Sequence, residues 1–259
     1  MKAAVSGQHS LRTHPEHKVR MAQIQHELDA IWEDGHQALA EGQVVTRACM
    51  SNLLIYCDDD DQCRDVAAAV PAIVQLHPSR VVLLTGRGKT SEPGIEVFVS
   101  GHYSVLSGGW QVCAEQIRVV ADDSAAPRLP SVARAQIVGD LPTALWWASR
   151  QPPPFAGKLF YPLATISDQI IYDSYAWKNP VRGQQAMSRW VATERTEYVI
   201  DNLAWRRLKQ WRSLISQVLD PAVHAEALSR VTRLEIEHGP HAVAMTSLLV
   251  GWLAALLGW

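Results

Sequence analysis

Acidic and polar side chains follow strand-like runs in the second half of the chain. Five of them stand at or just after the ends of DQIIYDS, EYVIDN and TALWW: Asp173, Ser174, Asp201, Asn202 and Arg150. If these runs form neighbouring parallel strands, their side chains meet at one edge of a sheet. Asp173 or Asp201 would then act as a general base or bind a sugar hydroxyl. Asp, Ser and Asn at strand ends are, however, more often helix caps and turn residues.

No recognised catalytic motif supports the enzyme interpretation. The chain contains no G-x-S-x-G, HExxH or G-x-G-x-x-G pattern. GRGKT at 86–90 looks like a phosphate loop, but the glycine required five positions before Gly88 is Leu83. We therefore predict a non-catalytic protein without a cofactor. The alternative is a sugar-phosphate- or nucleotide-binding α/β enzyme that uses the two aspartates and Arg150.

The run DDDD at 58–61 has the composition of a metal site. It stands shortly before VAAAVPAIVQL, and aspartates there favour a helix N-terminus, because they accept hydrogen bonds from its free amides and oppose the helix dipole. His238 and His241 flank a Gly-Pro turn, and no further ligands for a four-coordinate zinc ion can be placed beside them. No metal site is predicted.

Two adjacent tryptophans stand in GDLPTALWWASRQPPPF at 139–155. In a strand, Trp146 and Trp147 must point to opposite faces. One of them therefore belongs to the core. The other is a candidate for partner binding, because tryptophan is enriched at the hot spots of interfaces.

A second concentration of tryptophan lies in a basic stretch. Between 182 and 212 there are seven Lys or Arg residues and three acids, with Trp190, Trp205 and Trp211 among them. Arginine with tryptophan is typical of the centre of a protein interface. A solvated amphipathic face with tryptophans in the core is the alternative. The net charge of −2 argues against nucleic acid.

Alternating strands and helices must position these residues. Strand-like runs occur at 46–57, 79–85, 95–100, 110–120, 143–148, 168–174, 197–202 and 229–239. Helical patterns occur at 16–41, 66–76, 181–193, 205–220 and 242–259. The first strand, helix and strand form a βαβ unit with a parallel pair, and the runs at 95–100 and 110–120 form a hairpin. The predicted class is α/β, with two Rossmann-like or mixed-sheet halves and flanking helices.

Composition sets the expected domain organisation. The 259 residues are 47% hydrophobic and 19% charged, as in globular proteins. We predict a flexible tail at 1–15, an N-terminal α/β domain at 16–121, a linker at 122–130 and a C-terminal α/β domain at 131–259. The N-terminus has no apolar signal core, which predicts a cytoplasmic location.

The four cysteines all lie in the first half of the chain. Cys49 and Cys113 stand in apolar runs and are expected to be buried. Cys57 and Cys63 flank the acidic turn. A disulfide between them is the less favoured alternative to two free thiols, because disulfides are rare in the cytosol.

The C-terminal segment 242–259 carries no charge over 18 residues, the minimum length for a membrane span. It contains Thr246, Ser247, Gly251 and Gly258, and no basic cluster flanks it. We predict a buried or interface helix, with a tail anchor as the minor alternative.

Five motifs in this order carry a family resemblance: VCAEQIRV, GDLPTALWW, DQIIYDS, DNLAWRRLKQWR and GWLAALLGW. Together they resemble the OpcA family, the glucose-6-phosphate dehydrogenase assembly proteins of cyanobacteria and actinobacteria, as a short form that ends at the final GW. The resemblance covers nearly the whole chain from about residue 20 and adds TRACMSNLLIY and HPSRVVLL.

The resemblance implies a non-catalytic bacterial protein. It would bind glucose-6-phosphate dehydrogenase, promote its active oligomer and so support NADPH production in the oxidative pentose phosphate pathway. The candidate partner-binding residues are Trp146, Trp147, Arg150, Asp168, Asp173, Ser174, Asp201, Trp205, Trp211 and Arg212.

Overall fold

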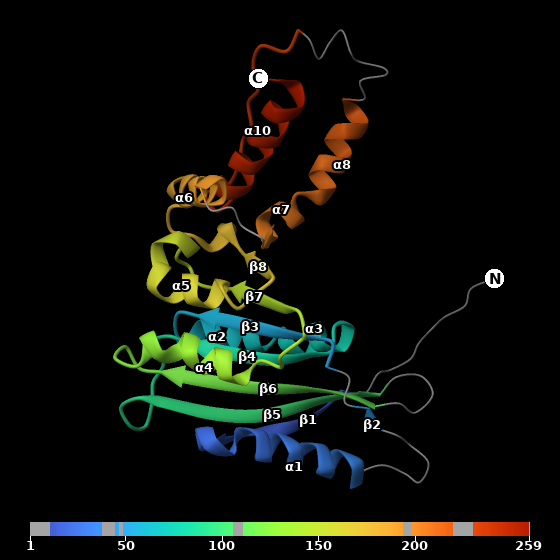
Figure 1. The fold of residues 1–259 in the computed structure, drawn as a ribbon. Coiled ribbons are helices and arrows are strands. Elements are labelled where there is room, and N and C mark those ends of the chain that lie inside the picture. Colours follow the sequence, from blue (N-terminus) through green and yellow to red (C-terminus); the bar gives the residue numbers. More distant parts are fainter. Residues whose placement is uncertain are drawn as a thin grey trace, which may run out of the picture. The chain divides into compact units, whose positions relative to one another are not determined.

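The structure is a computed structural model that describes residues 11–37, 45–46, 49–105, 111–193, 198–219 and 230–258. The chain divides into two compact units. The first unit comprises Met1–Ala148 and Lys158–Gln169, and the second comprises Ser149–Gly157 and Ile170–Trp259. Helices and strands alternate in both, so the predicted α/β class is confirmed (Figure 1).

Among the described residues, seven strands belong to the first unit: β1 (Leu11–Val19), β2 (Val45–Thr46), β3 (Ser51–Cys57), β4 (Ser79–Thr85), β5 (Ile95–Val105), β6 (Gln111–Ala121) and β7 (Thr143–Trp147). Their order is β1-β5-β6-β4-β3-β7, with β2 beside β6. The strands β6, β4, β3 and β7 are parallel, whereas β5 pairs antiparallel with both β1 and β6. Across the sheet these four strands lie in the order β6, β4, β3, β7. Numbered along the chain they are the third, second, first and fourth, which is the order found in a Rossmann-type sheet.

The central strands form where the sequence is continuously apolar. Every residue of β4 is buried, and so is every residue of β3 after Ser51. Both faces of these strands must therefore be covered. Two helices, α2 (Asp60–Ala67) and α3 (Val70–Leu76), connect β3 to β4 and so complete the predicted βαβ unit.

The acidic run before α2 is a helix cap, as predicted. The Asp59 carboxylate accepts a hydrogen bond of 2.9 Å from the Gln62 amide, and Asp60 and Asp61 occupy the first turn. These carboxylates oppose the positive end of the helix dipole. Among the described residues, no group of three or more His, Cys, Asp or Glu side chains is placed to hold a metal ion.

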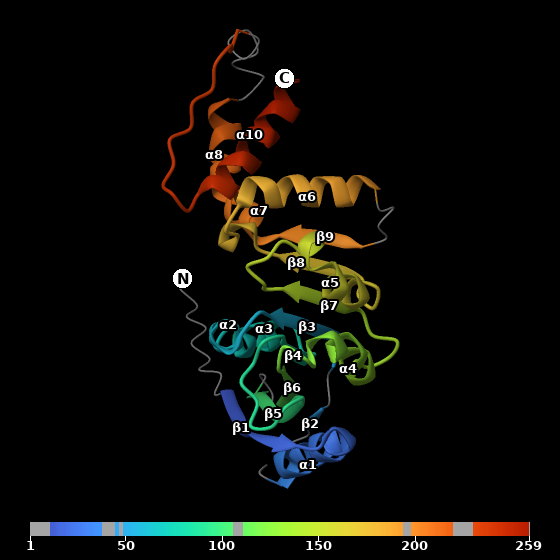
Figure 2. The same ribbon diagram turned by 90° about the vertical axis from the view of Figure 1, so that its left-hand side faces the viewer.

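Helices cover both faces of the parallel strands. Figure 2 shows α2 and α3 on one side of β3 and β4, and α4 (Leu129–Gln136) on the other. The helix α1 (Ile24–Gln37) packs against β5, and buries Ile24, Leu28 and Ile31.

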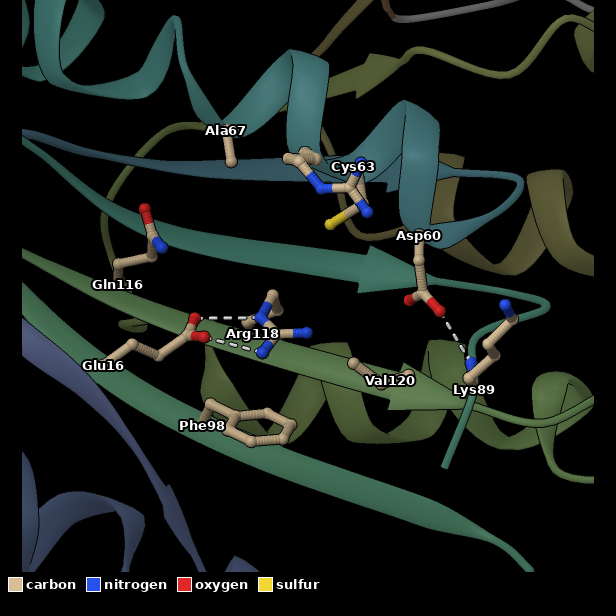
Figure 3. A pocket seen from close by; sticks show the side chains of 10 residues that line it. Glu16, Asp60, Cys63, Ala67, Lys89, Phe98, Gln116, Arg118 and Val120 are labelled. Carbon is tan, nitrogen blue, oxygen red and sulfur yellow. Dashed lines mark hydrogen bonds and ion pairs between the residues drawn. The ribbon is translucent and has the colours of Figure 1, made fainter. Parts of the chain in front are cut away.

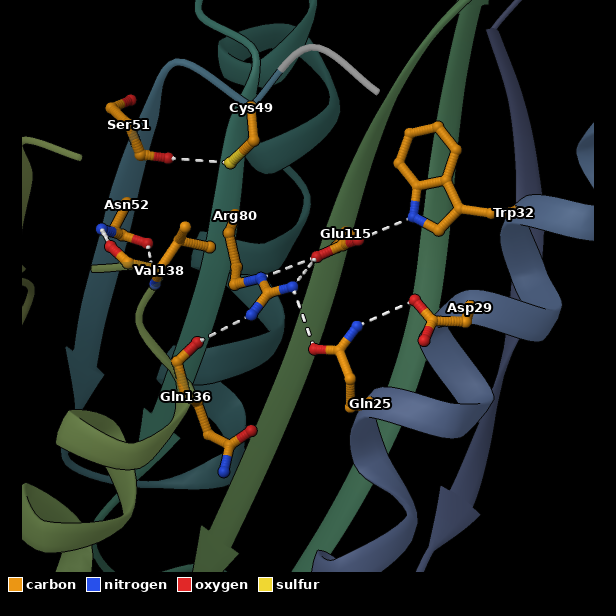
Figure 4. Close-up of polar contacts among 10 residues, drawn as sticks. All are labelled: Gln25, Asp29, Trp32, Cys49, Ser51, Asn52, Arg80, Glu115, Gln136 and Val138. Carbon is orange, nitrogen blue, oxygen red and sulfur yellow. Dashed lines mark hydrogen bonds and ion pairs between the residues drawn. The ribbon is translucent and has the colours of Figure 1, made fainter. Parts of the chain in front are cut away.

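A buried ion pair ties α1 and α4 to the sheet (Figure 4). Arg80 of β4 donates from Nε to Glu115 of β6 at 2.6 Å, and Trp32 of α1 donates to the other oxygen of Glu115 at 2.6 Å. The Arg80 guanidinium also reaches Gln25 of α1 and the Gln136 carbonyl at the end of α4. The side chains of Arg80 and Glu115 are only 10% and 5% exposed, so each depends on the other for its charge to be balanced.

The predicted tail and linker differ from the structure. Residues 11–15, predicted as flexible, belong to β1 and pair with β5; 1–10 lie outside the described residues. Residues 122–130, predicted as a linker, contain a 3-10 helix (Ala126–Arg128) and the start of α4. Ala125 and Leu129 are buried there, so the segment is part of the first unit's core. The chain first passes from the first unit to the second after Ala148.

Two local predictions are also corrected. Residues 16–23, predicted as the start of a helix, continue β1 and form a short 3-10 helix (Met21–Gln23) before α1 begins. Residues 230–239, predicted as a strand, pair with no strand in the described part of the chain.

The proline-rich segment after β7 forms a 3-10 helix (Pro153–Ala156) and α5 (Gly157–Ala164).

In the described part of the chain, six helices and strands lie wholly or mainly in the second unit: β8 (Gln169–Tyr172), β9 (Val199–Asn202), α6 (Pro180–Thr193), α7 (Leu203–Arg207), α8 (Lys209–Val218) and α10 (Val243–Leu257). A 3-10 helix (Ser174–Ala176) follows β8. The core of this unit forms around Leu208, Leu249 and Leu253, with Trp205 and Ile236 packed against it.

The apolar C-terminal segment forms α10, which supplies core residues to the second unit. Its 15 residues fall short of the ~20 that a membrane-spanning helix needs. No helix in the described residues combines the length and the apolar character required to cross a bilayer. Ala244, Leu249 and Leu253 of α10 are buried, as expected for a helix that contributes to the core.

Candidate functional site

The paired tryptophans alternate across β7 as predicted. Trp147 is fully buried, stacks on Tyr56 with ring centroids 4.4 Å apart, and meets Phe160 of α5 edge-on at 5.4 Å. A side chain with no exposed surface does not reach a partner. The docking prediction for this pair therefore narrows to Trp146.

Trp146 points to the opposite face, toward the helices α2 and α3. It is half-buried and packs against a cluster that includes Ile55, Leu83 and Val70. Most of its surface therefore serves the first unit's packing, and only an exposed remainder is open to a partner.

Asp168 fixes the start of the same strand. Its carboxylate accepts from the Thr143 amide at 2.7 Å, and its own amide donates to the Thr143 carbonyl at 2.8 Å. These two bonds satisfy the backbone of the first residue of β7. The contacts give Asp168 a positioning role within the first unit.

In the second unit, Asp173 is bound by an arginine from α7. Arg207 donates through Nη1 and Nη2 to the two carboxylate oxygens, both at 2.7 Å, which is the bidentate geometry of a strong pair. Asp173 also accepts from the Tyr175 amide and so caps the 3-10 helix after β8. The residue therefore joins the end of β8 to α7.

Ser174 and Asn202 form a buried polar link beside that ion pair. Asn202 donates to the Ser174 hydroxyl at 2.9 Å, and its carbonyl oxygen accepts from the Ala204 amide at 3.0 Å, where it caps α7. Ser174 is fully buried and Asn202 is 8% exposed. These are the cap and turn roles that the residue types predict.

Asp201 is held by Arg206, through one carboxylate oxygen. The guanidinium donates from Nε at 3.0 Å and from Nη2 at 2.6 Å to one oxygen of Asp201. Both aspartates of the enzyme alternative are thus engaged by arginines of α7. The guanidinium groups therefore occupy carboxylate oxygens that the enzyme alternative would use.

Trp205 and Arg212 form a third arginine contact. The Arg212 guanidinium carbon lies 3.5 Å from the centre of the Trp205 ring, a short cation–π contact. Trp205 also packs against the core around Leu208. The pair therefore connects α8 to the core of the second unit.

Trp211 differs from the other candidates, because it is 62% exposed on α8. Leu214 and Val218 are 57% and 68% exposed. The three residues stand at positions i, i+3 and i+7 and so lie along one face of the helix. We name this set the α8 stripe.

A groove of about 480 Å³ adjoins the α8 stripe. Its apolar lining comes from Leu208 between α7 and α8, from α8, from the extended segment 230–239 and from α10, and includes Leu208, Trp211, Ile215, Leu234, Ile236, Met245, Leu249 and Leu253. Glu235 and Glu237 add acidic groups to the lining. Of the ten candidate residues, only Trp211 lines this groove.

Sequence reasoning missed the rest of this surface. Leu214 and Val218 had a usable signal, the helical spacing from Trp211 within an otherwise polar helix. Leu234 and Ile236 were visible only as alternation, which we interpreted as a strand. The groove arises because segments about 30 residues apart in the chain come together, and a local pattern does not show that.

The chain is a mixed α/β protein, and its sequence matches two models of a single family. Residues 70–189 match the "glucose-6-phosphate dehydrogenase subunit N-terminal domain", and residues 198–259 match the C-terminal domain of the same subunit. The chain belongs to the OpcA family.

Two curated relatives are similar over most of this chain. The OxPP cycle protein OpcA of Nostoc punctiforme is 29% identical over 188 residues, which are 71% of this chain and 38% of the relative. The OxPP cycle protein OpcA of Synechococcus elongatus is 25% identical over 189 residues, which are 72% of this chain and 41% of the relative. The matched part thus spans about two fifths of the length of these relatives.

Proposed function

We propose that this protein binds glucose-6-phosphate dehydrogenase and promotes its active assembly without catalysing a reaction itself. The family match carries the proposal, because two domains described as parts of a dehydrogenase subunit cover 70–189 and 198–259. The role would support NADPH production by the oxidative pentose phosphate pathway in the bacterial cytoplasm.

The α8 stripe and its groove are the proposed contact surface. Trp211 offers a large apolar side chain that is mostly exposed, and Leu214 and Val218 extend the surface along one helix face. Tryptophan at the centre of an interface often accounts for ~2 kcal/mol or more of the binding free energy. The arginines Arg206 and Arg207 stand on α7, immediately before α8, and would contribute polar contacts at the rim.

Activation would follow from differential binding. A partner that binds the active oligomer about a hundredfold better than the inactive form shifts that equilibrium by about 2.7 kcal/mol. No group on this chain needs to enter the dehydrogenase active site. The paired state of Asp173 and Asp201 is compatible with that role.

The experiment uses purified dehydrogenase and the full chain. We expect a complex by calorimetry or light scattering, and higher dehydrogenase activity at limiting substrate. Trp211→Ala should weaken binding at least ~10-fold, as expected for loss of a hot spot. Tyr161→Ala is the matched control, because Tyr161 is an exposed aromatic of the first unit, 43% exposed.

Three outcomes would count against parts of this proposal. Absence of binding, of oligomer change and of activity change at saturating protein would remove the functional proposal itself. Unchanged binding by Trp211→Ala, with Trp146→Ala weakening it instead, would move the contact surface to the first unit. Thermal stabilisation by sugar phosphates or nucleotides alone would favour the enzyme alternative.

A further inference from the structure

A separate pocket in the first unit contains a thiol. It has a volume of about 490 Å³ and lies between α2 and the neighbouring face of the sheet. The lining comes from β1, α2, the turn after β4, β5 and β6, and includes Cys63, Arg64, Lys89, Phe98, Gln116 and Arg118. Figure 3 shows the sulfur of Cys63 directed from α2 toward Arg118.

The surroundings of Cys63 stabilise a thiolate. Cys57, at the end of β3, belongs to the same buried cluster as Cys63, and the fully buried Thr85 hydroxyl has no hydrogen-bond partner among the described residues. The neighbouring Cys57 thiol and Thr85 hydroxyl and the positive charge of Arg118 lower the pKa of Cys63 to about 7, against the opposing effects of burial and of Asp60. Cys57 shifts the other way, because the neighbouring Cys63 and burial both raise its pKa.

The charged groups of the pocket favour an anionic reactant. Arg118 is held over the Phe98 ring at 4.1 Å and paired with Glu16 at 2.6 Å, so both of their charges are partly compensated. Asp60 accepts from the Lys89 backbone amide at 2.7 Å. The side-chain charges of Lys89 and Arg64 lie at the exposed margin, and the ion-pair partner of Arg64 within the described ranges is the exposed Asp61.

We propose that Cys63 is a thiol–disulfide exchange site for small disulfides that carry carboxylates, and that Cys57 completes the exchange. The Cys63 thiolate attacks one sulfur of the small disulfide. A bond forms between that sulfur and Cys63, the original S–S bond breaks, and the released thiolate takes a proton from water. Cys57 then gives up its proton to water and attacks the Cys63 sulfur, which expels the second small thiolate.

The two steps balance. The two protein thiols are oxidised to one Cys57–Cys63 disulfide, and the small disulfide is reduced to two thiols. Access sets the order of the steps: Cys63 lines the pocket, whereas Cys57 is fully buried behind it. Both cysteines belong to one buried cluster between β3 and α2, so the second step takes place within that cluster.

Glutathione disulfide is the probe, with neutral hydroxyethyl disulfide and cationic cystamine as charge controls. Incubation of the reduced full chain at pH 7 should give an internal Cys57–Cys63 disulfide, located by peptide mapping of the wild-type protein. In Cys57→Ser the reaction should stop with one glutathione on Cys63. Glutathione disulfide should react faster than cystamine, and Lys89→Gln should reduce that difference.

Cys49 is the internal control. It is half-buried, and burial raises its pKa, so it should react ~10-fold or more slowly than Cys63 at pH 7. Cys49→Ser should leave the reaction at Cys63 unchanged. Equal labelling of Cys49 and Cys63, or an unreactive Cys63 in the wild-type chain, would overturn the proposal. Faster reaction with cystamine than with glutathione disulfide would overturn the assignment of an anionic reactant.

Discussion

Asp173 and Arg207, 34 residues apart, form two parallel hydrogen bonds of 2.7 Å that join the end of β8 to α7. The same arginine lies over the Tyr175 ring, with its guanidinium carbon 5.5 Å from the ring centre. Because the planar guanidinium matches both oxygens of the carboxylate, its effect depends on geometry as well as charge. The pair makes one candidate site residue, Asp173, part of a structural clamp within the second unit.

Arg207→Lys should therefore weaken the second unit although it keeps the charge. A lysine ammonium cannot make both bonds at once, and we expect a loss of about 0.5–1 kcal/mol, small because the Arg207 side chain is 47% exposed. A double-mutant cycle with Asp173→Asn, followed by urea unfolding, measures the coupling. A coupling near zero would mean that the pair adds nothing to stability.

The two tryptophans of β7 should differ in their contribution to stability. Trp147→Ala removes a fully buried side chain that contacts Tyr56 and Phe160, and should cost ~3–5 kcal/mol. Trp146→Ala removes a half-buried one and should cost less. Denaturant unfolding of both variants checks the order, and equal losses would show that both faces of β7 depend on tryptophan to the same degree.

The buried pair of Arg80 and Glu115 should be sensitive to loss of one partner. Glu115→Gln keeps the size of the side chain but leaves the buried Arg80 charge without compensation, which should cost ~3 kcal/mol or more. Asp61→Asn is the control, because the Asp61 side chain is 83% exposed beside Arg64 and should change stability by less than ~0.5 kcal/mol. Similar unfolding midpoints for the two variants would contradict this account.

Acid should weaken the hydrogen bonds by which Glu96 of β5 holds Lys18 of β1 and Ser91. Hydrogen bonds from Lys18 and Ser91 lower the pKa of Glu96 from its ordinary 4.5 to about 2. A lowered pKa in the folded state means stability that is present above pH 4.5 and lost as the pH falls through 2. Glu96→Gln should lose stability at neutral pH and show a flatter decline between these values, measured by thermal unfolding at several pH values. A decline of the same slope in both proteins would assign the acid sensitivity to other groups.

Much of the first unit could be predicted because its sequence is locally consistent. The apolar runs of β3 and β4 and the aspartates before α2 predict a parallel βαβ unit, and the structure has it. The strand β1 was missed because its sequence, LRTHPEHKV, is polar; it exists through pairing with β5 at the edge of the sheet. The linker prediction failed because proline and aspartate suggest a loop, while burial of Ala125 and Leu129 decides otherwise.

The candidate site was predictable only in part. Trp211 was a candidate because it stands in a stretch rich in arginine and tryptophan, and its exposure keeps it as a candidate. Asp173, Asp201 and Arg212 stood out equally, but their partners lie 5 to 34 residues away and no local pattern identifies them. The Cys57–Cys63 contact was visible as a spacing, whereas the pocket beside it depends on β1, β5 and β6, far along the chain.

Gly183 in α6 should tolerate no side chain, although alanine normally favours a helix over glycine by up to ~1 kcal/mol. A Cβ at this position would lie 2.4 Å from Cε3 of Trp177 and 2.8 Å from Cγ of Pro152. Trp177 is itself buried and stacked on Tyr172 at 5.3 Å, so it has little freedom to move. Gly183→Ala should therefore destabilise the second unit.

Gly251→Ala in α10 is the matched control, because no atom lies within 4 Å of its added Cβ. It should be neutral or stabilising, and thermal unfolding of the two variants should move in opposite directions. Stabilisation by Gly183→Ala would show that the close approach of α6 to Trp177 is not required by the fold.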